Sequence, residues 1–340
     1  MYYREYRMES KKDLEQYKKL VEDNKLVYEE CAFSYGIFDN GILIGAISLD
    51  GNCIKQICID VRYQGEGIAA TLVSKAIIYA NTQGISDLVV YTKPIYETIF
   101  NTLGFTTIIK TPQVLFLENK RDGINEYCKN LSKSMVKGDK ISSLVMNLNP
   151  ITNGHLYLIK ECVKNSDHTH LFLVKEDKSE FPYKVRLELL KEAVVGIDNL
   201  TIHDGSDYII SATTFPTYFI NSQDDIDKSY PTLDVNIFGT YIVKALGINF
   251  RYVGSEPFSK TTNIYNGILQ SELPKYDVEV ILLDRICYNE NVISATMVRK
   301  LIKQDKLEEV RNYVPKCVYE YLKSDNSTEI IKRIKLGNTN

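Results

Sequence analysis

The chain has 340 residues, 44% of them hydrophobic and 25% charged, which is typical of a globular protein long enough for two domains. Its net charge of −3 argues against a general nucleic-acid-binding protein. No apolar run reaches the ~18 residues needed to span a bilayer, the polar N-terminus does not resemble a signal peptide, and seven cysteines without a C-x-x-C pair indicate reduced thiols. We therefore expect a cytoplasmic protein with no membrane contact.

The first part of the chain has a mixed α/β pattern. Residues 35–50 read as two strands joined by a turn at Asn40-Gly41, which is a strong hairpin signal. A glycine-rich loop then opens a helix that ends near Gly84. The remaining predicted elements are strands over 53–60 and 87–92 and a short helix over 95–105.

Residues 119–139 are polar and rich in lysine, so we predict a linker there, with a short helix over 124–135. It separates a domain over 1–118 from a second domain over 140–335.

The second domain alternates strands and helices, which predicts βαβ units and a Rossmann-like parallel sheet. In such sheets ligands bind beyond the carboxyl ends of the strands. We predict strands over 141–148, 170–175, 199–204, 250–255 and 278–284, and helices from His155, over 183–195 and over 297–310.

Arg62, Gly65 and Gly67 form an R-x-x-G-x-G pattern at the start of the first-domain helix. Glycines let backbone N–H groups approach an anion, and the helix dipole favours one there, but a loop that needs glycine only for its turn fits equally well. No catalytic base is evident in this domain, because Asp60 and Glu66 fit solvated surface charges better.

The segment Thr152-Asn153-Gly154-His155 follows a predicted strand and opens a helix. Taken alone, His155 fits a helix-capping or core histidine better than a phosphate contact. Ser294 and Thr296, in "ISATMVRK" with Arg299, could simply cap the helix that follows them. A helix N-terminus with free hydroxyls is also a phosphate site, so both interpretations can hold together.

Other basic side chains are weaker candidates. Lys184 and Arg186 lie near the start of a predicted helix, where they could reach phosphates or form a solvated face. His168, His170 and His203 lack metal-ligand spacing, so we predict no metal site.

Two resemblances follow from these motifs. The glycine loop, with "FNTLGF" downstream, makes the first domain resemble the GNAT acetyltransferase fold, whose corresponding loop holds the pyrophosphate of coenzyme A. The pairing of T-x-G-H with I-S-x-T-x-x-R resembles the nucleotidyltransferase superfamily. Attack at the α-phosphate of ATP builds charge that imidazolium, guanidinium, hydroxyl and helix-end N–H donors can stabilise.

Almost the whole chain resembles the citrate lyase ligase family, on "NPITNGH", "IISATTFPTYFI", "FRYVGSEPFSKTTNIYN" and "DRICYNENVISATMVR". The resemblance implies an acid–thiol ligase. ATP and acetate would give acetyl-adenylate and diphosphate. The acetyl group would then pass to the thiol of a dephospho-coenzyme-A-type group on the acyl carrier subunit of citrate lyase, releasing AMP.

The resemblance also implies roles for individual residues. His155, Thr152 and Arg299 would act in catalysis, and Mg²⁺ would arrive with ATP, without a tightly bound cofactor. The implied ATP-binding residues are Asn149, Pro150, Thr152, Gly154, His155, Lys184, Arg186, Gly254, Ser294, Thr296 and Arg299.

For the first domain we hypothesise a docking role. Arg62, Gly65 and Gly67 would grip the pyrophosphate of the carrier's coenzyme-A-like arm, without acetyl transfer by this domain itself. For the acetate pocket, the apolar stretch near Phe215 and Tyr218 is the candidate.

Two alternatives remain. One is an adenylyltransferase acting on a phosphorylated small molecule such as phosphopantetheine or a mononucleotide. The other is a non-catalytic coenzyme A sensor, which would not need a site for departing diphosphate.

Overall fold

The computed structural model describes residues 3–175, 179–210, 215–220, 222–255, 260–289 and 291–337. It divides into two compact units, which we call the first unit (residues 1–127 with 216–233) and the second unit (residues 128–215 with 234–340). The division falls inside helix α4 (Gly123–Leu131), within the predicted linker. Residues 216–233, assigned from the sequence to the second domain, belong to the first unit.

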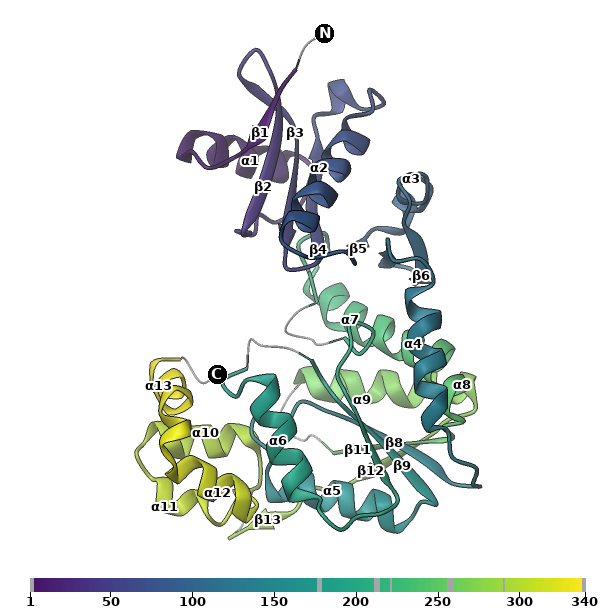
Figure 1. Ribbon diagram of the computed structural model, residues 1–340, viewed down its shortest axis with the longest axis vertical. Coiled ribbons are helices and arrows are strands. Elements are labelled where there is room, and N and C mark those ends of the chain that lie inside the picture. The colour runs from purple at the N-terminus through teal and green to yellow at the C-terminus, as the bar shows by residue number, and fades with distance from the viewer. Residues whose placement is uncertain are drawn as a thin grey trace. The chain divides into compact units, whose positions relative to one another are not determined.

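The first unit contains a seven-stranded sheet in the order β1-β2-β3-β4-β5-β7-β6 (Figure 1). All neighbours pair antiparallel except β4 and β5, which are parallel. The strands are β1 (Arg4–Arg7), β2 (Phe33–Asp39), β3 (Ile42–Asp50), β4 (Cys53–Ile59), β5 (Val89–Thr92), β6 (Thr106–Lys110) and β7 (Leu115–Glu118).

Helices α1 (Lys11–Asp23) and α2 (Ile68–Thr82) pack against opposite faces of this sheet. Successive side chains of a strand point to opposite faces, so β3 serves both helices: Leu43 packs in the cluster of α1 and Ile44 in that of α2. A short helix, α3 (Glu97–Thr102), precedes β6. The charged N-terminal residues, for which we predicted no element, form β1 and α1, because Tyr17, Leu20 and Val21 give α1 one buried stripe.

The second unit contains a parallel five-stranded sheet in the order β10-β9-β8-β11-β12, as the alternating pattern predicts (Figure 1). The strands are β8 (Ile141–Met146), β9 (His168–Leu173), β10 (Leu200–His203), β11 (Phe250–Gly254) and β12 (Glu279–Leu283). The chain order reverses between β8 and β11, so this pair marks the topological switch point. A small hairpin, β13 (Cys287–Tyr288) and β14 (Asn291–Val292), follows.

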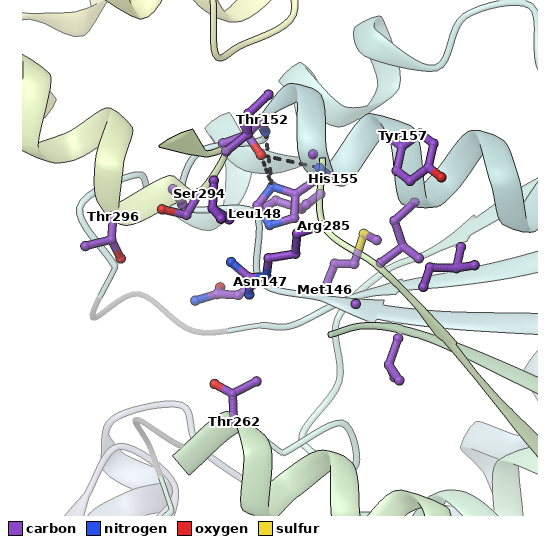
Figure 2. A pocket seen from close by; sticks show the side chains of 18 of the residues that line it. Met146, Asn147, Leu148, Thr152, His155, Tyr157, Thr262, Arg285, Ser294 and Thr296 are labelled. Atoms are coloured by element: carbon purple, nitrogen blue, oxygen red, sulfur yellow. Dashed lines mark hydrogen bonds between the residues drawn. The ribbon is translucent and has the colours of Figure 1, made fainter. Parts of the chain in front are cut away.

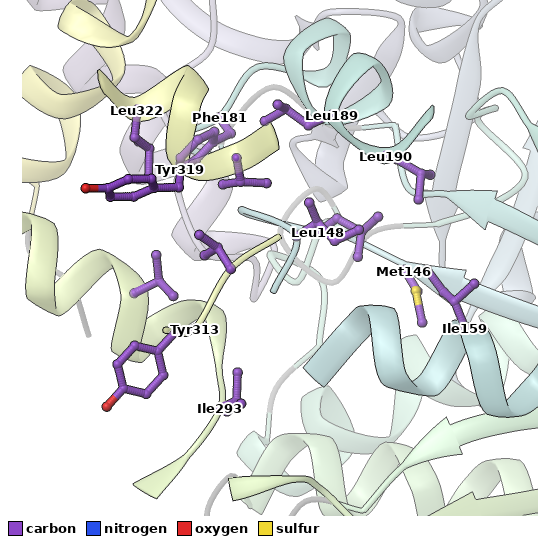
Figure 3. Packing of buried hydrophobic residues seen from close by; sticks show 14 of the residues in the cluster. Met146, Leu148, Ile159, Phe181, Leu189, Leu190, Ile293, Tyr313, Tyr319 and Leu322 are labelled. Atoms are coloured by element: carbon purple, nitrogen blue, oxygen red, sulfur yellow. The ribbon is translucent and has the colours of Figure 1, made fainter. Parts of the chain in front are cut away.

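One face of this sheet carries the main core of the second unit (Figure 3). Leu144 and Met146 of β8 pack with Ile159, Leu190 and Leu322 from three helices. The helices of this unit are α5 (Asn153–Lys164), α6 (Tyr183–Ala193), α8 (Val243–Leu246), α9 (Lys260–Glu272), α10 (Ala295–Lys303), α11 (Leu307–Val310), α12 (Lys316–Lys323) and α13 (Thr328–Leu336); the division between the units falls within α7 (Gln223–Ile237).

The predicted helix over 297–310 is wrong in one respect. It is two helices, α10 and α11, because the chain turns at Asp305, whose φ is +59°. Aspartate tolerates the left-handed conformation better than most residues, so the break is local. In the part of the chain that the structure describes, no helix is long and apolar enough to cross a membrane.

Candidate functional site

A cavity of about 930 Å³ opens in the second unit where β8 and β11 part. The two strands pair only at Ser142 with Phe250 and at Ser143 with Arg251, and beyond these pairs they diverge. We call this space the switch-point cavity. Residues from the carboxyl ends of β8, β11 and β12 line it, together with the N-termini of α5 and α10. Ligands of open parallel sheets bind at this position.

The N-terminus of α5 is closed by a reciprocal pair of contacts between Thr152 and His155 (Figure 2). The backbone N–H of His155 donates to Thr152 Oγ1 at 3.3 Å, and the backbone N–H of Thr152 donates to His155 Nδ1 at 3.1 Å. Thr152 is buried, and the ring of His155 is half-buried at the cavity wall. The helix cap and the candidate phosphate contact are therefore the same structure.

These contacts fix how the His155 ring carries its proton. Since Nδ1 accepts a hydrogen bond, the proton of the neutral ring lies on Nε2 at the opposite edge. Burial, and secondarily the nearby Arg285, lowers the pKa of His155 to about 4. We predicted an imidazolium from the sequence, and this is corrected here: in the ligand-free protein near pH 7 the group is a neutral N–H donor.

Gly154 brings the second motif to this helix. A Cβ on Gly154 would lie 3.1 Å from the backbone oxygen of Ile293, so a larger residue would push the two segments apart. Ser294 caps α10, its Oγ accepting the N–H of Met297 at 3.1 Å, and Thr296 lies in the first turn. Ser294 and Thr296 line the switch-point cavity with His155, so the structure brings both sequence motifs together.

Arg299 ties α10 to the loop after β8. Its Nη1 donates to the backbone oxygen of Asn149 at 2.6 Å, and its Nε lies 3.5 Å from a carboxylate oxygen of Glu180. Asn149 in turn donates to Glu180 at 2.6 Å and accepts from the N–H of Phe181 at 3.1 Å. Arg299 and Asn149 both line the cavity, as does Gly254 at the end of β11.

Three predicted ATP-binding residues do not line this cavity: Pro150, Lys184 and Arg186. Lys184 is exposed, and Arg186 is 1% exposed. The guanidinium of Arg186 donates to the backbone oxygens of Asn147, Phe181 and Val174 at 2.6–3.0 Å. Its observed role is to hold the loops after β8 and β9.

Sequence reasoning missed several residues of the cavity. Arg285 follows β12, donates from Nε to the backbone oxygen of Ser255 at 2.7 Å, and lies beside the His155 ring (Figure 2). The rule that ligands bind beyond strand ends could have found it. Thr262 lies across the cavity on α9, and Lys300 adds a further cation. Arg251 also lines the cavity.

The other histidines form a buried group on β9 and β10. His170 Nδ1 lies 2.9 Å from His203 Nε2, and His168 Nε2 lies 2.8 Å from Thr201 Oγ1. Burial is the main cause that lowers the pKa of all three, to about 3 for His170 and about 4 for His203. Across the described ranges there is no group of three or more His, Cys, Asp or Glu side chains that could hold a metal ion.

The first unit has its own cavity, of about 400 Å³, which we call the apolar cavity. Strands β4 and β5 pair only at Cys53 with Val89 and at Ile54 with Val90, and the cavity opens where they part. Gly65 and Gly67 line it, with φ of +89° and +78° that only glycine adopts readily. Among the described residues of its lining there is no Asp, Glu, His or Cys.

The charged residues near the glycine loop are paired with each other or with neighbours. Arg62, predicted to bind the arm, does not line the cavity and binds Asp60 through Nε at 3.0 Å and Nη2 at 2.6 Å. These bonds lower the pKa of Asp60 to about 2. Glu66 accepts a hydrogen bond from Tyr3 Oη at 2.7 Å. Neither acid lines the apolar cavity.

One wall of the apolar cavity comes from the later part of the chain. Tyr218 and Phe219 line it and are 6% and 2% exposed. The backbone oxygen of Tyr218 accepts the N–H of Val27 at 2.8 Å, and its Oη lies 3.4 Å from the backbone oxygen of Tyr91. Tyr218, the candidate for the acetate pocket, thus belongs to the first unit, whereas the family segment around Glu256-Pro257 lies outside the described residues.

Comparison with known proteins identifies both halves. The family model described as acetyltransferase (GNAT) domain matches residues 6–115, and the model described as citrate lyase ligase C-terminal domain matches residues 141–322. The curated citrate (pro-3S)-lyase ligase of Escherichia coli K12 is 40% identical over 288 residues, covering 83% of this chain and 82% of the relative. The ligase of Haemophilus influenzae is 37% identical, covering 85% and 88%.

A shorter match connects the chain to a different enzyme. The phosphopantetheine adenylyltransferase of Streptococcus uberis is 32% identical over 71 residues, covering 20% of this chain and 43% of that enzyme. The two family models confirm the predicted fold class, a GNAT-like domain followed by a domain with a parallel sheet. The chain belongs to the citrate lyase ligase family.

Proposed function

We propose that this protein activates citrate lyase by acetylating the thiol of its carrier-bound prosthetic group, with ATP and acetate as substrates and acetyl-adenylate as the intermediate. The observation that carries the proposal is the switch-point cavity, where His155, Thr152, Ser294 and Arg299 meet at two helix N-termini. The names of the curated relatives supply the lyase as the target.

The first step is nucleophilic substitution at phosphorus. A carboxylate oxygen of acetate attacks the α-phosphorus of Mg²⁺-bound ATP, a new P–O bond forms, and the bond to the bridging oxygen breaks as diphosphate leaves. The Nε2–H of His155, the hydroxyls of Ser294 and Thr296 and the guanidinium of Arg299 are donors for the charge that develops. Arg285 and Lys300 add positive charge to the same cavity.

The second step moves the acetyl group. The carrier thiol, as its thiolate, attacks the carbonyl carbon of acetyl-adenylate, the C–S bond forms, and AMP departs with the electrons of the broken C–O bond. Phosphate and adenylate never bond to the protein, so positioning and electrostatic stabilisation are sufficient for both steps.

The first unit supplies a docking site for the carrier's arm in this proposal. A pyrophosphate would lie at the glycine loop, where Gly65 and Gly67 expose backbone N–H groups at the start of α2. The thin, uncharged part of the arm that carries the thiol would enter the apolar cavity. The lining without a carboxylate, histidine or cysteine supports docking over independent acetyl transfer.

The products test the proposal directly. Protein, Mg²⁺–ATP, labelled acetate and the thiol form of the carrier subunit should give acetyl-carrier, AMP and diphosphate in equal amounts. Formation of ADP and phosphate would point to an acetyl-phosphate route and would overturn the adenylate intermediate.

A second candidate is AMP transfer to a phosphorylated small molecule, which the match to a phosphopantetheine adenylyltransferase favours. That match covers only a fifth of the chain. Incubation with ATP and phosphopantetheine without acetate should give no dephospho-coenzyme A, and accumulation of that product would decide for the second candidate.

A further inference from the structure

Arg251, which belongs to neither phosphate motif, lies at the inner end of the switch-point cavity. Arg251 lies at the last position where β11 pairs with β8, opposite Ser143, and it lines the cavity that opens beyond this pair. Gly254, at the carboxyl end of β11, is three residues further along the strand, which corresponds to roughly 10 Å.

The guanidinium of Arg251 is buried with its hydrogen-bonding capacity only partly used. The residue is 2% exposed, and its Nε and Nη1 are buried without a hydrogen-bond partner. Its Cζ lies 4.7 Å from the centre of the Phe238 ring. Buried polar groups are nearly always satisfied, so an arginine with unsatisfied N–H groups beside a cavity points to a ligand that completes it.

A carboxylate that interacts electrostatically with Arg251, that of Asp234, does not complete this hydrogen bonding. Asp234 accepts a hydrogen bond from Tyr265 Oη at 2.7 Å, and it leaves Nε and Nη1 of Arg251 without a hydrogen-bond partner. Burial raises the pKa of Asp234 to about 6, although Arg251 and Tyr265 act in the opposite direction.

We propose that Arg251 binds the carboxylate of the small acid that the enzyme activates. This inference rests on the proposed function, which requires a carboxylate close to ATP but separate from the phosphate donors. Arg251 places a positive charge at the inner end of the switch-point cavity, between the sheet and α9. An acid bound there would be close to the nucleotide and separate from the phosphate donors. Arg251 is thus a specificity residue that selects an anion, and the Phe238 ring gives this end of the cavity an apolar side.

Steady-state exchange of labelled diphosphate into ATP tests the assignment. Arg251→Lys keeps the charge and loses the planar guanidinium, and we expect at least a tenfold higher KM for acetate with the KM for ATP within twofold of wild type. Arg285→Lys is the matched variant: it replaces another arginine of the same cavity, beside His155, and should raise the KM for ATP more than that for acetate. Equal changes in both KM values for Arg251→Lys would overturn the proposal.

Wild-type protein gives a test that does not depend on the variant folding. Propionate should compete with acetate in the exchange reaction, whereas acetamide, which has the same shape without the charge, should not compete at tenfold higher concentration. Competition by acetamide as strong as that by propionate would exclude recognition through a cation. Absence of any acetate-dependent exchange in wild type would instead contradict the proposed function itself.

Discussion

The two units each place a cavity where two parallel strands part, yet the cavities have opposite chemistry. In the second unit the split between β8 and β11 is lined, among the described residues, by three arginines, a lysine and one aspartate (Arg251, Arg285, Arg299, Lys300 and Asp284). In the first unit the split between β4 and β5 is lined mainly by isoleucine, leucine, valine and aromatic side chains. In both units the cavity is created by two strands that diverge, and the lining side chains determine which kind of ligand fits.

This contrast suggests a division of work. The cationic cavity suits the triphosphate and the reacting carboxylate, where charge develops. The apolar cavity suits a neutral arm with its charge confined to the glycine loop. Substitutions in the apolar cavity should therefore weaken carrier acetylation and leave acetyl-adenylate formation intact, and substitutions in the switch-point cavity should leave binding of the arm intact.

The largest effect should come from Arg299→Ala. It removes a cavity cation together with the anchor to Asn149, so acetate-dependent diphosphate exchange should fall by about 100- to 1,000-fold. Arg299→Lys should lose less activity. Coenzyme A binding to the first unit, measured by calorimetry, should stay within twofold for both variants, and a parallel loss of that binding would break the separation of roles.

Gly65→Asp tests the glycine loop of the apolar cavity in the first unit. A carboxylate at the glycine loop would repel a pyrophosphate, so the KM for the carrier should rise about tenfold (about 1.4 kcal/mol) with diphosphate exchange unchanged. Gly41→Asp is the matched control, because its φ of +82° is close to the +89° of Gly65 and its Cβ also meets open space, but it does not line the cavity. Equal effects of the two variants would show that backbone strain, and not charge, is responsible.

Acid should destabilise the second unit more than the first, because all four histidines of the chain lie in the second unit. The folded-state pKa values of His170 and His203 are depressed to about 3 and 4, below the unfolded value near 6.5. The unfolded chain therefore binds more protons as pH falls below 6.5. Between pH 7.5 and pH 5 the protonation of this pair should lower the free energy of unfolding by roughly 2–4 kcal/mol. Above pH 6.5 the contribution of this neutral histidine pair to the stability of the second unit should be fully present.

Hydrogen exchange resolved by peptide measures this loss. Protection of β9 and β10 should decrease at pH 5, after correction for intrinsic rates, while β2 and β3 of the first unit keep theirs. His203→Gln should weaken the pH dependence. Equal acid sensitivity of both sheets would contradict the assignment to the histidine pair.

The smallest effect should come from Tyr218→Phe. It removes a hydroxyl that donates weakly to the backbone oxygen of Tyr91, at 3.4 Å, and interacts with the backbone of Gln56, so the first unit should lose about 1 kcal/mol in urea unfolding. Diphosphate exchange should be unchanged. A clear loss of exchange would place Tyr218 in the acetate pocket, as its apolar surroundings suggested from the sequence.

Local signals were enough to predict much of this molecule. Strand periodicity, the turn at Asn40-Gly41 and the two phosphate motifs predict the fold class, and their positions at helix N-termini predict a shared cavity for His155 and Ser294. Long-range packing was not predictable. Nothing in the sequence around Arg186 tells that three backbone oxygens surround it, and nothing near Tyr218 tells that its segment joins the first unit.

The protonation of His155 shows the same limit at one residue. The spacing of Thr152 and His155 predicts a helix cap with a nearby imidazole, but the pKa depends on burial and on Arg285, which is 130 positions away in the sequence. Tertiary structure therefore changes the expected imidazolium into a neutral donor, while the residue and its location stay as predicted.

The most direct test of the account is acetate-dependent exchange of labelled diphosphate into ATP by wild type, His155→Ala and His155→Gln. We predict exchange that requires acetate, falls by about 100-fold or more in His155→Ala, and is partly restored in His155→Gln, whose amide can donate as the neutral ring does. Exchange that proceeds without acetate, or that His155→Ala leaves unchanged, would contradict acetyl-adenylate formation at this cavity.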